Sequence, residues 1–294
     1  MKRILTFLCA LCLLLPFCGC KKQETPPPAV TALPVTGAVE VTVLSLGKAD
    51  AIVITTASKT VVIDAGEIDD GGKVLNYLNE KGRSVIDYLI ITHYDRDHVG
   101  GADRLLNFAE VKQVIRPDYD GVRDEYITFL DSISGLGIPD TALASGSDDL
   151  SITVEDLHLT INSPLKSSYV NAEGVQQDNN FSLIIKAQHG AKTFLFAGDA
   201  EDERLAELIT SETNWQSDFL KIPYHGNFTE LSSGFFQRVK PAYAVACDSD
   251  KNPMADETKA ALALLGCQTY GTMNGTVVCK SDGANLTVTQ LPKE

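Results

Sequence analysis

The segment from His93 to Gly101 reads HYDRDHVGG and places two histidines and two aspartates within six positions. In an extended segment side chains alternate between two sides, so His93, Asp95 and Asp97 point the same way, while His98 follows at the turn into a helix. Neutral imidazole and carboxylate oxygen are the usual protein ligands of zinc and related divalent ions. The pattern predicts a metal site. The alternative is a polar loop that caps the helix, with Asp97 as the N-cap residue.

Three more potential ligands each follow an apolar strand. Asp64 comes after VVI, Asp199 after TFLFAG and His225 after FLKIPY, so each strand can deliver one polar residue to a shared sheet edge. This is the arrangement that a two-metal hydrolase needs, because divalent ions lower the pKa of bound water and hold the oxygen on which charge builds. Each also has a structural alternative: a turn residue for Asp64, a helix N-cap for Asp199 and a structural histidine for His225.

The elements that position these residues are predicted from hydrophobic periodicity. β-Strands are expected at VEVTVLSL, AIVITT and TVVIDAG, separated by turns at 47–50 and 57–59. Helices are expected at 73–82, from 99 onwards, and at 126–136, 201–208, 234–239 and 257–265. Further strands are expected at 88–92, 152–162, 181–187, 193–199, 218–224, 242–248, 276–280 and 286–290. Two β-rich halves that each add helices predict an α/β (α+β) sandwich of sheets with helices outside, in a single domain over residues 39–294.

Composition limits the function further. The chain has 294 residues, 44 % hydrophobic and 22 % charged, which is typical of a globular protein rather than a disordered or multi-pass membrane protein. Its 25 Lys and Arg against 39 Asp and Glu give a formal charge of −14. An acidic surface repels a polyphosphate backbone, so no tight nonspecific DNA binding is expected. A core of about 250 residues needs no metal for stability, so a metal site must have a functional reason.

The first twenty residues predict a secretory signal, because Lys2 and Arg3 precede an apolar stretch at 4–17 that is too short to span a bilayer. The end of this stretch, FCGC, resembles the lipobox of bacterial lipoproteins, in which cleavage leaves Cys20 carrying diacylglycerol. The resemblance implies a lipoprotein signal peptide at 1–19 and an extracytoplasmic protein anchored to a bacterial membrane through its N-terminal lipid. Plain secretion is the alternative. Residues 20–38, which are rich in proline, predict a semi-extended linker.

The remaining cysteines and histidines suggest no second site. Cys247, Cys267 and Cys279 are odd in number and form no C-x-x-C pair, so they predict small apolar core residues and at most one internal disulfide. Whether Cys267 and Cys279 pair stays open. His158 and His189 lie far from the ligand motifs and are expected at the surface.

The order of the segments GKADAIVI, TVVIDAGE, ITHYDRDHVGGA, DNNFSLII, TFLFAGDAE, DFLKIPYHGN and MNGTVV resembles metallo-β-lactamase-fold hydrolases. Within that fold it resembles the hydrolase domain of the ComEC competence proteins, over residues 39–280. The resemblance implies an αββα sandwich with a dinuclear metal site on one edge.

The resemblance also implies a ligand set of three histidines and three aspartates. One ion would be held by His93 and Asp95, the other by Asp97, His98 and His225, with Asp199 bridging the two. Asp64 resembles a supporting aspartate that orients a ligand. Because the set is rich in oxygen donors, the expected cofactors are two divalent ions, zinc first, with manganese or iron as further candidates.

Two segments depart from the family pattern. Where many members supply another histidine, this chain has Asp178-Asn179-Asn180, so the first ion has a weaker protein shell, in which Asn180 is a supporting residue. Where the subgroup has His-His-Gly-Ser, this chain has Tyr-His-Gly-Asn, so Tyr224 faces the substrate. A phenol can donate a hydrogen bond to a phosphoryl oxygen but is no proton shuttle near pH 7. Asp97 and Tyr224 are the expected catalytic residues.

These patterns predict a metal-dependent hydrolase of phosphoesters or phosphodiesters that uses a hydroxide activated by two metal ions. The family resemblance favours nucleic-acid substrates, whereas the acidic charge favours a small phosphoester, and both stay open. A binding or scaffold protein that keeps the fold with little or no catalysis is the alternative, because of the Asn-rich segment and Tyr224. Cleavage of β-lactams is not expected, since the first metal lacks the family's third histidine.

Overall fold

The computed structural model describes residues 31–293, in which strands and helices alternate around two large β-sheets. The helices are α1 (Asp70–Glu80), α2 (Arg96–Val99), α3 (Ala102–Phe108), α4 (Asp124–Leu136), α5 (Asp202–Thr210), α6 (Ser232–Val239) and α7 (Asp256–Ala263). Short 3₁₀ turns lie at η1 (Asp178–Phe181), η2 (Tyr224–Gly226) and η3 (Thr272–Asn274).

Most of the strands are short, and they fall into two groups along the chain. The N-terminal group is β1 (Val39–Val43), β2 (Ile52–Thr55), β3 (Thr60–Ile63), β4 (Val85–Ile86), β5 (Tyr88–Ile90), β6 (Glu110–Val111), β7 (Val114–Pro117) and β8 (Asp140–Leu143). The C-terminal group is β9 (Leu150–Val154), β10 (Leu157–Asn162), β11 (Ile184–His189), β12 (Lys192–Phe196), β13 (Phe219–Lys221), β14 (Tyr243–Ala246), β15 (Gln268–Gly271), β16 (Val277–Ser281) and β17 (Leu286–Gln290).

The first sheet has the strand order β17-β16-β1-β2-β3-β5-β7-β8, and the second has β15-β14-β13-β12-β11-β10-β9. In the first sheet the hairpins around β1 to β3 are antiparallel, and the pairs from β3 through β5 and β7 to β8 are parallel. In the second sheet β12 to β15 are parallel. Each sheet therefore contains parallel strands whose carboxyl ends can present polar side chains at one edge.

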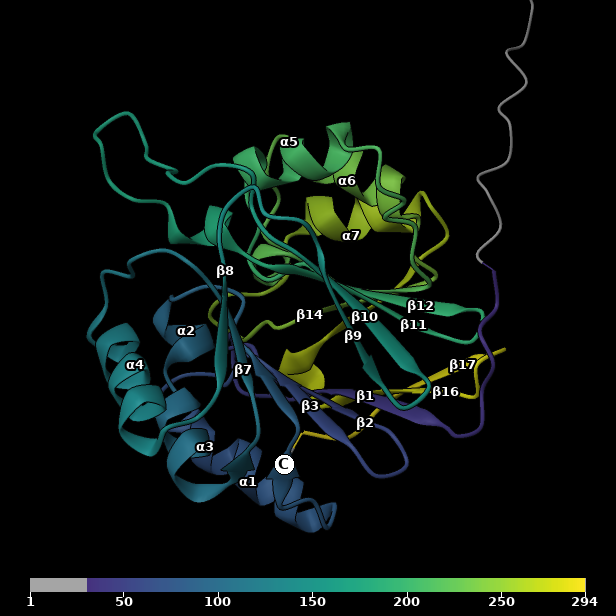
Figure 1. The fold of residues 1–294 in the computed structure, drawn as a ribbon. Helices are drawn as coiled ribbons and strands as arrows, with labels where there is room; N and C mark the ends of the chain where they lie inside the picture. The colour runs from purple at the N-terminus through teal and green to yellow at the C-terminus, as the bar shows by residue number, and fades with distance from the viewer. Residues whose placement is uncertain (1–30, 294) are drawn as a thin grey trace, which may run out of the picture. The chain divides into compact units, whose positions relative to one another are not determined.

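The two sheets pack face to face with helices on both outer faces, giving four layers (Figure 1). The central core is aliphatic and aromatic and includes Ile54 and Ile63 from the first sheet and Leu159 and Phe196 from the second. A second cluster packs α1 to α4 on the first sheet, and a third packs α5 to α7 on the second. The predicted αββα sandwich is confirmed.

The segment ITVEDLHLTIN is not one strand, as its length suggested, but the hairpin β9–β10. Val154 pairs with Leu157, and Glu155 takes a φ of 53° in the two-residue turn between them. A left-handed residue at this position matches the twist of the strands in a tight hairpin. The sequence analysis also missed β7 and β8. β7 contains Arg116 and Pro117, and only Leu143 is buried in β8, so neither has a clear strand pattern.

Several predictions concern residues 1–30, which lie outside the described part: the signal peptide at 1–19, the lipidation of Cys20 and most of the linker at 20–38. Residues 31–38, the described part of the predicted linker, contact the body: Leu33 N donates to Gly190 O (3.1 Å), and Thr36 N to Asp156 Oδ2 (2.5 Å). Within residues 31–293 no helix has the length and apolar character to span a membrane.

Two predictions on isolated residues have different outcomes. Cys247, Cys267 and Cys279 are free thiols and are buried, as expected for core residues, so Cys267 and Cys279 do not pair. The surface position expected for His189 is wrong. Its ring is fully buried and contacts Ser281 Oγ at 2.8 Å, because the turn after β11 lies against the end of β16.

Candidate metal centre

The candidate site lies where strands of both sheets end. β3 is followed by Asp64, β5 by His93, β12 by Asp199 and β13 by His225, and the loop between β1 and β2 contributes Asp50. Backbone hydrogen bonds connect these loops: Asp50 N donates to Asp97 O (3.0 Å), and Ala65 N to His98 O (2.8 Å). The loops that carry the polar side chains are therefore fixed to one another as well as to their strands.

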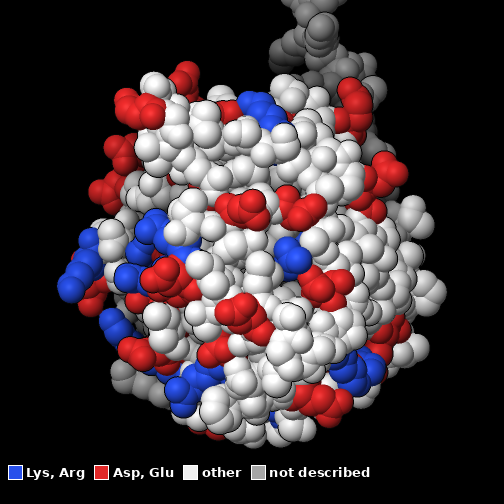
Figure 2. All heavy atoms as spheres, turned by 60° about the vertical axis from the view of Figure 1, so that its left-hand side comes forward, with Lys and Arg blue, Asp and Glu red and all other residues white. Residues whose placement is uncertain are grey.

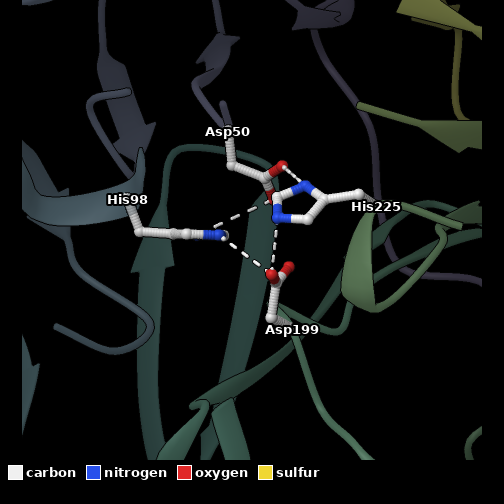
Figure 3. Close-up of side chains that lie close together, drawn as sticks. All are labelled: Asp50, His98, Asp199 and His225. Atoms are coloured by element: carbon white, nitrogen blue, oxygen red, sulfur yellow. Dashed lines mark ion pairs between the residues drawn. The ribbon is translucent and has the colours of Figure 1, made fainter. Parts of the chain in front are cut away.

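Four side chains point toward one shared point in Figure 3: Asp50, His98, Asp199 and His225. All four are buried, and each offers one ligand atom within 4.8 Å of the others. Asp199 Oδ2 lies 2.7 Å from His225 Nε2 and 3.3 Å from His98 Nε2. The carboxylate of Asp199 therefore lies between two imidazoles, where a bridging ligand would lie.

The other three predicted ligands adjoin this group. Asp97 Oδ2 lies 3.3 Å from His225 Nε2, and the rings of His93 and His98 are 4.1 Å apart between centroids. Asp95 is more peripheral, with Oδ2 3.8 Å from His93 Nε2. The structure thus brings all six predicted metal ligands into one region.

The three histidines share an orientation that suits metal ligation. The Nδ1 atoms face oxygens of supporting residues: Thr92 Oγ1 at 3.0 Å for His93, Asp64 Oδ2 at 2.8 Å for His98 and Asp50 Oδ1 at 3.6 Å for His225. Their Nε2 atoms face the carboxylates of Asp95 and Asp199 instead. An imidazole whose Nδ1–H is held by an oxygen keeps the Nε2 lone pair for a metal, and outer partners of this kind fix the ring.

Buried polar atoms without hydrogen bonds test whether a metal fits here. Six such atoms belong to this region: Asp50 Oδ1, His93 Nε2, Asp97 Oδ2, His98 Nε2, Asp199 Oδ1 and His225 Nδ1. Buried polar groups are rarely left without partners, because desolvation costs about 1–3 kcal/mol for each. A concentration of unpartnered nitrogen and carboxylate oxygen atoms is the environment that divalent cations satisfy. The residues therefore fit a divalent metal ion, and Asp50, His98, Asp199 and His225 form one group that could hold it.

Asp64 has the supporting position that the resemblance implies. Its carboxylate accepts hydrogen bonds from Thr92 N and Thr92 Oγ1, both at 2.8 Å, and faces His98 Nδ1 at 2.8 Å. Asp64 is fully buried, and its φ is 58°. Such a conformation is costly for a residue other than glycine and is retained where neighbouring contacts require it. Here it turns the carboxylate back toward the histidine loop.

Sequence reasoning missed two residues of this region, Asp50 and Lys221. The GKAD segment was interpreted as a turn, and the lysine of FLKIPY as part of a strand. Lys221 is fully buried, forms an ion pair with Asp50 Oδ2, lies 3.6 Å from Asp199 Oδ1 and donates to Gly198 O at 3.1 Å. A signal was present, because a lysine in an apolar strand of a covered sheet needs a buried carboxylate partner.

The charges of this group shift one another's protonation. Burial disfavours the charged form of His98 and His225, but the surrounding carboxylates outweigh it, raising the pKa of His98 well above its ordinary value and that of His225 to about 10. His93 behaves differently, because burial and the charge of His98 lower its pKa. Burial opposes ionisation of Asp50, yet Lys221 and His98 hold its pKa at about 2. Without metal, two imidazolium ions and Lys221 balance the carboxylates.

The Tyr224-His225-Gly226 turn has unusual backbone geometry. Tyr224 and His225 have φ values of 50° and 53°, and Gly226 has 85°. A Cβ on Gly226 would lie 2.7 Å from Met254 Cγ, so a larger residue would displace the turn. Two consecutive left-handed residues are strained, and strain of this kind is concentrated at functional sites. The turn directs the His225 ring inward while Tyr224 stays half-buried, with ring centroids 6.5 Å apart.

Asn180 supports the site from a greater distance. Its Oδ1 accepts from Arg204 N (3.1 Å) in the first turn of α5, and the side chain is buried. The neighbouring Ser182 Oγ accepts from Asp199 N (3.1 Å) and lies 3.5 Å from His93 Nδ1. The segment that lacks the family's histidine therefore positions Asp199 and α5.

Metal binding should release protons, and the number should depend on pH. At pH 7 the metal-free protein carries protons on His98 and His225, because both pKa values are raised, that of His225 to about 10. A metal ligand must be the neutral imidazole. We expect up to two protons to be released per chain at pH 7, and the apparent affinity to rise about tenfold per pH unit for each proton, with the contribution of His225 levelling off near pH 10. Titration calorimetry in buffers of different ionisation enthalpy measures this, and binding without proton release would contradict it.

Comparison with known proteins shows which proteins this chain is similar to. Residues 44–167 match the family model described as the metallo-beta-lactamase superfamily, a range that includes the HYDRDH motif. The chain is 28 % identical over 198 residues to ComE operon protein 3 of Bacillus subtilis, which covers 66 % of this chain and 24 % of that protein. It is also 28 % identical over 219 residues to Recombination protein 2 of Haemophilus influenzae, covering 73 % of this chain and 25 % of that protein. The match thus spans about a quarter of each relative's length.

A solved structure agrees on the fold. A protein of Parabacteroides distasonis, whose assignment as a metal-dependent hydrolase is itself provisional, superposes with a TM-score of 0.53. The two chains are 14 % identical, and the alignment covers 82 % of this chain and 97 % of the other, so the similarity concerns the fold alone. The family-model match identifies a metallo-beta-lactamase domain within residues 44–167, and the chain is similar to competence proteins of the ComEC type.

Proposed function

We propose that the protein is a metal-dependent phosphodiesterase that uses two divalent ions held by the candidate metal centre. The observation that carries this proposal is the shared orientation of His93, His98 and His225. Their Nδ1 atoms face supporting oxygens, and their Nε2 atoms face the carboxylates of Asp95 and Asp199, of which Asp199 has an unpartnered buried oxygen. A cluster of structural salt bridges does not require three imidazoles with this shared orientation, whereas a site that binds two cations does.

The class of substrate follows from the donor set and the relatives. An oxygen-rich site suits the hard cations that act on phosphoryl groups. One curated relative is named for recombination, which is a process of DNA. Phosphodiesters, nucleic acid included, are therefore the proposed class, in agreement with the sequence-based expectation.

The reaction would be hydrolysis of one ester bond. The oxygen of water forms a bond to phosphorus, one P–O ester bond breaks, and the leaving alkoxide takes a proton, giving a phosphomonoester and an alcohol. Bound divalent cations would supply Lewis-acid activation of the water and of the phosphoryl group. Asp199 would hold the reacting centre between His98 and His225, since its carboxylate contacts both rings.

Two residues of this chain would act at the mouth of the site. Asp97 Oδ2 contacts His225 Nε2, which belongs to the ligand group. The same oxygen forms an ion pair with Lys48, whose side chain is partly exposed. Burial and the charge of Glu201 raise the pKa of the Tyr224 phenol, so it stays protonated at neutral pH and can donate a hydrogen bond to a phosphoryl oxygen.

A second candidate is a binding or scaffold protein with little catalysis. It is favoured by the thin shell of the first ion, for which Asp95 approaches His93 only to 3.8 Å and Asn180 supplies no ligand. A scaffold would keep the fold and bind one ion without turnover.

Metal removal separates the two candidates. We expect the purified protein to hydrolyse bis-p-nitrophenyl phosphate, to lose this activity after dialysis against a chelator, and to recover it when zinc or manganese is restored. Release of p-nitrophenol is measured by its visible absorbance. The chelated protein should keep its circular dichroism spectrum, so that loss of activity is not loss of fold. Metal-loaded protein that releases no p-nitrophenol would favour the scaffold.

We also propose that the hydrolase acts outside the cytoplasm, tethered to a bacterial membrane by lipid on Cys20. The support is the sequence pattern of residues 1–20. One acyl chain binds membranes only marginally, whereas several hold a soluble domain stably. Replacing Cys20 by Ser should move the protein from the membrane fraction to the soluble extracytoplasmic fraction, and an unchanged distribution would contradict the anchor.

A further inference from the structure

A pocket of about 510 Å³ opens beside the candidate metal centre. Asp95 and Asp97 form its inner wall, so it borders the reacting centre directly. Three cationic side chains from three separate loops also line it: Lys48 before β2, Arg96 at the start of α2 and Arg123 before α4. Five carboxylates line the same pocket, so its three cations are paired rather than free, in a chain with a formal charge of −14.

The cations of this pocket pair with the predicted metal ligands. Lys48 Nζ lies 2.6 Å from Asp97 Oδ2, and Arg123 Nη2 lies 3.5 Å from Asp95 Oδ1. Both side chains are about half exposed, so they can move within the pocket. Cations bound by Asp95 and Asp97 would compete for the same oxygens, which would leave the ammonium and the guanidinium without their carboxylate partners.

Resting on the proposed function, we propose that Lys48 and Arg123 form a phosphate-binding subsite that holds one phosphodiester group beside the metal centre. Both residues carry donors suited to phosphoryl oxygens, a point charge in lysine and a planar fork in arginine. Once their carboxylates are engaged by metal, these donors face the position from which a substrate enters. Lys48 thus has two opposed effects: it competes with metal for Asp97, and it attracts the substrate.

The outer wall of the pocket limits the length of the substrate. Glu67, Asp124 and Glu125 line it, and Glu67 lies 3.6 Å from Arg96. On the face in Figure 2, which brings the side of α2 and α4 forward, blue and red side chains are interspersed and form no continuous basic band. A polynucleotide needs a basic groove along several phosphates. The subsite therefore favours a small diester with a single charge over a nucleic-acid chain.

The Lys48→Met variant tests the proposal, because it removes the charge and keeps a stem of similar length. We expect its KM for bis-p-nitrophenyl phosphate to rise about tenfold, from the loss of one charge-assisted contact. We also expect its affinity for Mn²⁺ or Zn²⁺, measured by calorimetric titration of metal-free protein, to increase. Arg123→Gln should also raise the KM for bis-p-nitrophenyl phosphate. The wild-type protein should have a higher kcat/KM for the small diester than for a single-stranded DNA oligonucleotide.

Lys259→Met is the matched control. Lys259 has an exposure comparable to that of Lys48 and pairs with the exposed Asp256 on α7, with Nζ 3.0 Å from Oδ1, away from the pocket. This variant should leave both the KM and the metal affinity unchanged. An unchanged KM in Lys48→Met, weaker metal binding in it, or preference of the wild type for DNA would each overturn the subsite. Failure of the wild type to hydrolyse any diester would instead overturn the proposed function, while the metal titration still reports on Lys48.

Discussion

Replacing Asp199 by Asn is expected to reduce diester hydrolysis by at least about 1000-fold, which corresponds to ~4 kcal/mol of lost transition-state stabilisation. The reason is position: the carboxylate contacts both His98 Nε2 and His225 Nε2 and retains one unpartnered buried oxygen. An amide has nearly the same shape but lacks the charge that holds paired cations. The measurements are the rate of p-nitrophenol release and the metal content per chain, and both should fall.

Asp256→Asn, at an exposed position on α7, is the control for this variant and should behave like the wild type. The Asp199→Asn protein should keep the circular dichroism spectrum of the wild type, so that loss of activity is not loss of fold. An Asp199→Asn protein with full metal content and rate would show that Asp199 does not hold the reacting centre.

Replacing Lys221 by Met is expected to lower the free energy of unfolding of the metal-free protein by about 3–5 kcal/mol, the usual cost of breaking one side of a buried ion pair. Lys221 is fully buried and neutralises Asp50. Burial disfavours the ammonium, but Asp50 and Asp199 raise its pKa above the ordinary value, so it stays charged. Without it, Asp50 is a buried carboxylate whose nearest remaining cation is the His225 ring. Urea denaturation at pH 7 measures the difference.

The double variant Lys221→Met, Asp50→Asn separates the pair from general packing. Removing both charges leaves no isolated buried ion, so the double variant should be more stable than Lys221→Met alone. If the double variant loses the sum of the two single losses, Lys221 and Asp50 are not energetically coupled.

Much of the fold could be predicted because its elements have strong periodicity. The apolar strands β3 and β12 are buried on both faces, and α5 has a clear apolar side formed by Leu205 and Leu208. The elements that were missed or merged have weaker patterns. β8 buries only one residue, and the β9–β10 hairpin turns at Glu155 without a glycine.

The candidate site could be predicted in part, since residues that directly follow parallel strands meet at one edge. This reasoning selected Asp64, Asp199 and His225, which the structure brings together around His98. It did not find Asp50 and Lys221. The lysine in an apolar strand indicated a buried carboxylate partner, but no local pattern identifies Asp50 as that partner, because the pair connects the two sheets. The orientation of each imidazole is also absent from a sequence, since it depends on Thr92, Asp64 and Asp50 behind the rings.

The most direct test of the metal centre is a crystal structure of the protein grown with Mn²⁺ or Zn²⁺, with diffraction recorded at the absorption edge of the metal. Strong anomalous peaks should lie in contact with the Nε2 atoms of His98 and His225 and with the carboxylate of Asp199, and a second peak should lie beside His93 and Asp95. Anomalous maps with no peak near these imidazoles, from crystals with intact side chains, would contradict the metal-centre assignment.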